Sequence, residues 1–315
     1  MIGVKRASAR HFASLVFIVF AKASSAHAQA AAAPPPVVQT PSPMTDETRP
    51  HERLTQRELK GSTRTFVGPM AKPVEVFVPT DLPKRDEFNL VVHFHGTAWL
   101  AEQAVSVADK HAVAAVLNLG TGSGVYDRSF SDPAALDSLL ANIAREVSMA
   151  SGKPKRVGAI TLVGFSAGYG AVRAILREPR HFARVSSVLL LDGMHTSYVP
   201  EGMTLAAGGV IDSINLIAFR NFALAAVQHE KRFLVTHSEI FPGSYASTTE
   251  TANWILHSIN AHQKPVLKPG PRGMQQLSEL HVGHFEVLGF AGNSAPDHID
   301  QLHGMPEFLT RLLKM

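Results

Sequence analysis

The chain has 315 residues, of which 45% are hydrophobic and 18% are charged. This balance excludes both a disordered chain and a protein made mostly of membrane spans. The chain contains no cysteine, which excludes disulfides, thiolate metal sites and a catalytic cysteine. Its length predicts one large domain or two small ones.

Most of the positive charge lies at the N-terminus. The formal net charge is +4, from 30 basic and 26 acidic residues. Residues 1–28 contain Lys5, Arg6, Arg10 and Lys22 and no acidic residue. Removing these four leaves 26 basic against 26 acidic residues, so the rest of the chain is formally neutral. The charge therefore predicts no nucleic-acid partner.

Residues 1–28 predict a secretory signal peptide. Three basic residues precede an apolar stretch from Phe12 to Ala21, and Ala26-His27-Ala28 follows as a cleavage site. The apolar stretch is about half of the ~20 residues that span a bilayer, although an uncleaved membrane anchor is the alternative. We expect export to the periplasm or the medium, without stable membrane insertion after cleavage.

Residues 29–59 predict a linker rich in Pro and Ala, followed by a polar segment. Three consecutive prolines, Pro34 to Pro36, favour an extended polyproline conformation. We expect the folded domain to span residues 60–315.

Apolar strands alternate with helical patterns after residue 60. The predicted strands cover residues 64–67, 74–78, 88–94, 112–119, 156–163, 185–191, 232–236 and 285–290. The predicted helices cover residues 133–149, 169–177, 211–229, 247–262 and 298–313, together with 101–111. The first two strands favour an antiparallel pair. The others predict a mostly parallel sheet with helices on both faces, an α/β fold.

The strongest chemical signal is the pattern Gly164-Phe165-Ser166-Ala167-Gly168. It lies directly between a predicted strand and a predicted helix, where flanking glycines permit a sharp turn that presents the serine. Ser166 is therefore the predicted nucleophile, and the N–H of Ala167 is a predicted donor to a tetrahedral oxyanion. An ordinary glycine-rich turn is the alternative interpretation.

Residues 60–315 resemble the α/β-hydrolase superfamily. The run G-F-S-A-G-Y, followed by a strand that ends in LLLDG, is similar to bacterial secreted members of the esterase type. The resemblance implies a catalytic triad in the chain order Ser, acid, His. It also implies that His95-Gly96, which follows a buried strand, forms the oxyanion turn and that Thr97 supplies the second N–H donor.

Two histidines near the oxyanion turn have other interpretations. We interpret His95 as a structural residue that braces the turn. His93 and His95 also form an H-x-H pair, which is a possible pair of metal ligands on one strand face. No third ligand follows at a diagnostic spacing, so the sequence predicts no metal and no cofactor.

Two acidic residues are candidates for the triad. Asp192 ends the strand after the nucleophile helix, and Glu239 follows the next strand. The resemblance favours Asp192, because the look-alike esterases carry Asp after LLL, and Glu239 is the alternative. Asp192 could also be a simple turn residue, since Asp-Gly is a turn signal.

His298 is the predicted base. It follows the last predicted strand, in the loop that leads into the final helix, where the superfamily places its histidine. His281 and His284 lie at the start of that strand, and His303 lies deeper in the final helix.

These roles predict a serine hydrolase that cleaves a carboxylic ester through an acyl-enzyme intermediate. The substrate would be a small-molecule or oligomeric ester. An acyltransferase, a peptidase with the same triad and an inactive binding protein of this fold are the alternatives. We expect residues 194–229 to form either a small helical cap over the site or an ordinary packing helix.

Overall fold

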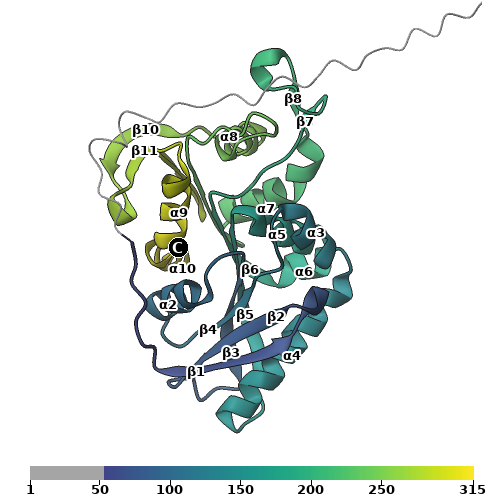
Figure 1. Cartoon of the computed structure of the whole chain (residues 1–315), viewed down its shortest axis with the longest axis vertical. Helices are drawn as coiled ribbons and strands as arrows, with labels where there is room; N and C mark the ends of the chain where they lie inside the picture. Colours follow the sequence, from purple (N-terminus) through teal and green to yellow (C-terminus); the bar gives the residue numbers. More distant parts are fainter. Residues whose placement is uncertain (1–52) are drawn as a thin grey trace, which may run out of the picture. The chain divides into compact units, whose positions relative to one another are not determined.

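The computed structural model describes residues 53–315, shown in Figure 1. The predicted signal peptide and most of the predicted linker lie outside these residues. Within them, ten strands form a mixed sheet in the order β1-β2-β4-β3-β5-β6-β9-β12-β11-β10. None of the helices in this part of the chain has the length and apolar character needed to cross a membrane.

The middle of the sheet is parallel, as predicted. Its strands are β4 (Val113–Leu117), β3 (Glu87–Phe94), β5 (Arg156–Phe165), β6 (Val185–Leu191), β9 (Arg232–His237) and β12 (Phe285–Phe290). Their continuous apolar runs are typical of strands that are buried on both faces. The predicted antiparallel pair is confirmed as β1 (Gly61–Val67) and β2 (Pro73–Pro79), which join the sheet through β4.

The opposite edge of the sheet was not predicted. There β11 (Gln275–Val282) and β10 (Lys264–Pro269) add antiparallel strands beside β12. Both strands are largely polar and partly exposed, and β10 contains Pro265 and Pro269. Proline is tolerated at a sheet edge because no neighbouring strand needs its missing N–H. These segments therefore lack the apolar runs from which the other strands were predicted.

Helices cover both faces of the sheet (Figure 1), as predicted. One face carries α2 (Ala98–Ala108), α9 (Ala295–His303) and α10 (Met305–Lys314). The other carries α3 (Ser123–Ser129), α4 (Pro133–Ser151), α5 (Tyr169–Arg177), α6 (Pro179–Arg184), α7 (Ile217–Val227) and α8 (Thr248–Ser258). Successive residues of a strand point to opposite faces of the sheet. In β3, Val91 packs against the face that α2 and α10 cover, and Val92 packs against the face that α4 and α5 cover.

The helix predicted over 211–229 is shorter than expected. Asp212 accepts a hydrogen bond from the Ile214 N–H and starts a tight turn, so α7 begins only at Ile217. This helix buries Phe219 and Phe222 in the core, as an ordinary packing helix does. The segment before it carries a small antiparallel pair, β7 (Tyr198–Val199) with β8 (Val210–Ile211), in place of a helical cap.

The final predicted helix, 298–313, is two helices. α9 ends at His303, with Gly304 as its C-cap, and α10 carries Pro306 in its first turn, where the missing proline N–H costs no helical hydrogen bond. α9 also starts earlier than expected, at Ala295, because Ser294 and Asp297 form a capping box. His298 therefore lies on the first turn of a helix rather than in a loop.

Candidate active site

Ser166 occupies a strained turn between β5 and α5. Its φ is +46°, a left-handed value that is uncommon for a residue other than glycine. A Cβ on Gly168 would lie 2.1 Å from the Phe94 carbonyl oxygen, and one on Gly164 would lie 3.0 Å from the Tyr169 nitrogen. The turn is therefore closed tightly enough that both flanking positions require glycine. This is the geometry of a nucleophile elbow.

The end of β6 lies directly beside this turn. Asp192 follows β6 with a φ of +40°. A Cβ on Gly193 would lie 2.5 Å from the Ser166 carbonyl oxygen. The absence of a side chain at Gly193 thus allows the two loops to come into contact, which holds Asp192 near the serine turn.

The Asp192 carboxylate is only 2% exposed and is fully engaged in hydrogen bonds. It accepts from the Ser238 N–H at 3.0 Å, the Ser238 hydroxyl at 2.7 Å and the Thr248 hydroxyl at 2.6 Å. The fourth partner is His298 Nδ1, at 2.7 Å from Oδ2. An ionised carboxylate can only accept, so Nδ1 carries the hydrogen and Nε2 stays free to take a proton.

The surroundings of Asp192 keep it ionised. Burial by itself raises the pKa of this carboxyl group. The hydrogen bond and charge of His298, with the hydroxyls of Thr248 and Ser238, outweigh burial and lower the pKa to about 2. A negative charge next to the imidazole at neutral pH is what stabilises an imidazolium.

His298 reaches the serine turn from α9. Its ring stacks on that of Phe165, with 4.6 Å between the centroids. Ser166, Asp192 and His298 line one cavity of about 290 Å³. The structure thus brings together the three side chains that the sequence suggested, from the ends of β5 and β6 and from the start of α9.

Glu239 is held elsewhere. Its carboxylate accepts from the Gly292 N–H at 3.0 Å, and its own N–H donates to the Gly292 carbonyl at 2.9 Å. Glu239 therefore links the loop after β9 to the loop that precedes α9. His281 and His303 are also engaged away from the serine, with Glu286 and with the Leu54 N–H respectively. His284 packs edge-on against His229.

The predicted oxyanion turn is built on an asparagine that the sequence analysis missed. His95 and Gly96 both have positive φ, +68° and +136°. The Gly96 N–H donates to Asn118 Oδ1, and Asn118 Nδ2 donates back to the Gly96 carbonyl, both at 2.8 Å. This side chain fixes the peptide just before Thr97, the N-cap residue of α2. The sequence offered one indication of this role: Asn118 directly follows β4, the strand that pairs with β3, and His95 follows β3.

His95 does more than brace the turn. Its Nδ1 lies 2.9 Å from the Tyr126 hydroxyl, and the imidazole lines a second cavity of about 500 Å³ together with Ser166 and Ala167. Burial, and then the charge of His298, lower its pKa. It is therefore a neutral group of the site.

His93 lies beneath the predicted oxyanion turn, close to Gly96, and lines neither of the cavities that contain Ser166. It is 1% exposed, and neither ring nitrogen has a hydrogen-bond partner within residues 53–315. Burial, and then the neighbouring His95, lower its pKa to about 3. Among the described residues, no group of three His, Cys, Asp or Glu is placed to hold a metal ion.

We expect His93 to make the fold sensitive to acid. Its pKa is about 3 in the folded chain and 6.5 when exposed, so the unfolded chain alone takes up a proton between these values. Stability is therefore complete above pH 6.5 and falls as the pH drops toward 3, by roughly 2 kcal/mol between pH 6.5 and 5. Urea unfolding at pH 7 and pH 5 measures this loss. His93→Leu should reduce it, and the exposed-site control His257→Leu should not. An unchanged loss in His93→Leu would contradict the assignment.

His195 and Tyr245 were also missed by the sequence analysis. His195 lies three residues after Asp192 and lines both cavities that contain Ser166. Its ring meets Tyr169 and Tyr245 edge-on, at centroid distances of 5.7 and 5.0 Å. His195 could have been predicted as a site residue from its position three residues after Asp192.

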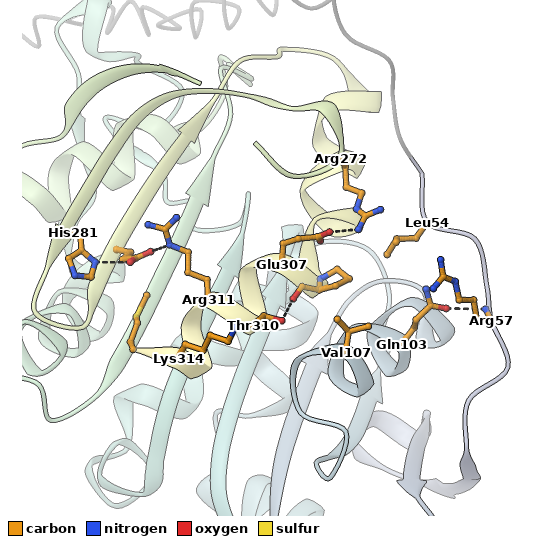
Figure 2. Close-up of a pocket in the computed structure, with 13 residues that line it drawn as sticks. Leu54, Arg57, Gln103, Val107, Arg272, His281, Glu307, Thr310, Arg311 and Lys314 are labelled. Atoms are coloured by element: carbon orange, nitrogen blue, oxygen red, sulfur yellow. Dashed lines mark hydrogen bonds and ion pairs between the residues drawn. The ribbon is translucent and has the colours of Figure 1, made fainter. Parts of the chain in front are cut away.

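A larger cavity, of about 750 Å³, lies away from these residues (Figure 2). It opens between α2, α10 and the chain around Leu54. Arg272 pairs with Glu307 there, and Arg311 pairs with Glu286. None of the residues predicted for catalysis lines it. Cavity size alone therefore does not identify a functional site, and the candidate site is the arrangement around Ser166.

No protein-family model and no curated protein matches this sequence. Solved structures that resemble the chain include an esterase from Pyrobaculum calidifontis, with 13% identity, coverage of 82% of this chain and 85% of that one, and a TM-score of 0.47. The feruloyl esterase module from Clostridium thermocellum has 11% identity, coverage of 82% and 95%, and a TM-score of 0.45. Carboxyl esterase 2 from Tuber melanosporum has 12% identity, coverage of 85% and 91%, and a TM-score of 0.45.

The fold is that of an α/β-hydrolase. This assignment rests on the chain itself: a mostly parallel sheet with helices on both faces, and a serine on a strand-to-helix elbow at the carboxyl end of a central strand. The three esterase structures are too distant from this chain to add to this assignment.

Proposed function

We propose that the chain is a serine hydrolase that cleaves a carboxylic ester through an acyl-enzyme intermediate. The observation that carries the proposal is the 2.7 Å contact between His298 Nδ1 and the buried Asp192 carboxylate, in a cavity that Ser166 also lines. An oriented imidazole beside a strained serine is the arrangement that activates a hydroxyl nucleophile.

In the proposed reaction, Ser166 Oγ attacks the ester carbonyl carbon while His298 Nε2 takes the hydroxyl proton. The backbone N–H groups of Ala167 and Thr97 donate to the oxyanion, and each such donor is typically worth ~2.7–4 kcal/mol of the barrier. His298 then gives the proton to the leaving alkoxide, which departs as the alcohol. Water, deprotonated by the same imidazole, releases the carboxylic acid and restores Ser166.

Asp192 orients the ring and stabilises its charged form without taking the proton. Its three other hydrogen-bond donors hold the carboxylate in place. Metals and cofactors have no part in this sequence of steps. An acyltransferase would share the first half of the reaction, with a second alcohol in place of water.

A fluorophosphonate probe tests the proposal directly. We expect one stoichiometric adduct, mapped by mass spectrometry to Ser166, because only a serine with an oriented base attacks the probe at neutral pH. Labelling should be lost in Ser166→Ala and in His298→Ala, and kept in Ser138→Ala, which alters an exposed serine on α4. Absence of labelling in the folded wild-type chain would overturn the proposal.

A further inference from the structure

Two cavities meet at Ser166, and their linings differ. The smaller, of about 290 Å³, is lined by Asp192 and His298, by apolar groups of Ile240, Pro242 and Ala295, and by Thr248, Asn293 and Ser294. His195 and Tyr245 line both cavities. The larger, of about 500 Å³, is lined by His95 and Ala167 on one side of Ser166. The remaining wall of the larger cavity is rich in hydroxyl groups, from Thr121, Ser123, Tyr169, Thr196, Ser197 and Tyr245.

The proposed mechanism assigns a different part of the ester to each cavity. His298 must protonate the leaving oxygen, so the alcohol lies on the side of the smaller cavity that His298 lines. The larger cavity, which Ser166 and Ala167 also line, is then left for the acyl group, and we call it the acyl cavity. Arg173 also borders it, but its charge is balanced by Asp127 at 2.8 Å. The acyl cavity is therefore polar and close to neutral.

His195 borders the acyl cavity and carries a hydrogen-bond acceptor. Its Nδ1 lies 2.9 Å from the Ala246 carbonyl oxygen, which can only accept. Nδ1 therefore carries the hydrogen, and Nε2 of the neutral ring carries a lone pair. Burial lowers the pKa of this imidazole, so the neutral form persists at pH 7. No partner for Nε2 is found among residues 53–315.

His95 also borders this cavity. Its Nδ1 lies 2.9 Å from the Tyr126 hydroxyl, which itself accepts from the Leu119 N–H at 3.2 Å. The imidazoles of His95 and His195 therefore both line the acyl cavity.

We propose that the acyl cavity selects a hydroxylated acyl group and that His195 Nε2 accepts a hydrogen bond from its hydroxyl. A long unsubstituted alkyl chain would leave His195 Nε2 without a partner, at a cost in binding. Sites built to bond a substrate hydroxyl discriminate strongly against analogues that lack it. This inference rests on the proposed function.

Matched ester substrates test the inference. We compare kcat/KM for the 4-nitrophenyl esters of butanoic, 2-hydroxybutanoic and 3-hydroxybutanoic acid, which share one leaving group. In the wild-type chain, at least one hydroxylated ester is expected to exceed the butanoate at least tenfold. His195→Leu should lower that ratio at least tenfold. His195→Gln should retain most of it, because the glutamine amide oxygen is an acceptor near the position of Nε2.

The matched control is His257→Leu, which changes an exposed histidine at the end of α8 and should leave the ratio as in the wild type. A wild-type preference for the butanoate, or an unchanged ratio in a folded His195→Leu variant, would overturn the inference. If His195→Leu does not fold, the ratio of kcat/KM values for the wild-type chain alone still tests the inference. Fluorophosphonate labelling of Ser166 in the same samples separates the two proposals: labelling without a hydroxyl preference rejects only the acyl-group inference, and no labelling rejects the proposed function as well.

Discussion

Ser166→Ala is expected to lower kcat for 4-nitrophenyl butanoate by about 10⁶-fold. The change removes the only atom that the mechanism uses to form the acyl-enzyme, so no covalent route remains. Alanine retains the Cβ that serine already has, and the turn keeps its shape. The melting temperature should therefore stay within a few degrees of the wild-type value. Initial rates and thermal unfolding on the same preparation measure both quantities.

The control for Ser166→Ala is Ser138→Ala, which makes the same chemical change on an exposed helix face. It should keep wild-type kcat. Hydrolysis that persists at the wild-type rate in a folded Ser166→Ala variant would show that another group carries the reaction, and the mechanism would have to be abandoned.

The second large expected loss of activity comes from changing Asp192, the proposed acid of the triad. Asp192→Asn should lower kcat roughly 10⁴-fold. An asparagine amide is neutral and can donate to His298 Nδ1, which favours the wrong tautomer and removes the charge that stabilises the imidazolium. Glu239→Gln should change kcat less than tenfold, because a glutamine oxygen can still accept from the Gly292 N–H.

The same variants need a measure of folding, since Asp192 is buried and accepts hydrogen bonds from Ser238 and Thr248. Urea unfolding identifies any loss of activity that comes from instability alone. If Glu239→Gln is the more damaging of the two folded variants, Glu239 must replace Asp192 as the acid of the triad.

Local patterns in the sequence were enough to predict the elements near the serine. α5 has the predicted bounds, because its glycine-rich N-terminus and its apolar spacing are properties of consecutive residues. The Gly-x-Ser-x-Gly pattern of the turn is equally local, whereas the close approach of Gly168 to the Phe94 carbonyl depends on the neighbouring strand β3. Prediction failed where the signal was weak or interrupted: polar edge strands β10 and β11, and the helix that Pro306 divides into two.

The amino-acid pattern was sufficient to predict a serine on an elbow, acidic residues after the following strands, and a histidine near the C-terminus. The folded chain was needed to show that Asp192 rather than Glu239 contacts His298, that Asn118 holds the turn at Gly96, and that His95 and His195 line the cavity next to Ser166. A turn is set by the dihedral preferences of adjacent residues, whereas a contact between side chains 106 positions apart depends on how the sheet orders its strands. Backbone propensity carries the first kind of information, and only the packing of the whole domain carries the second.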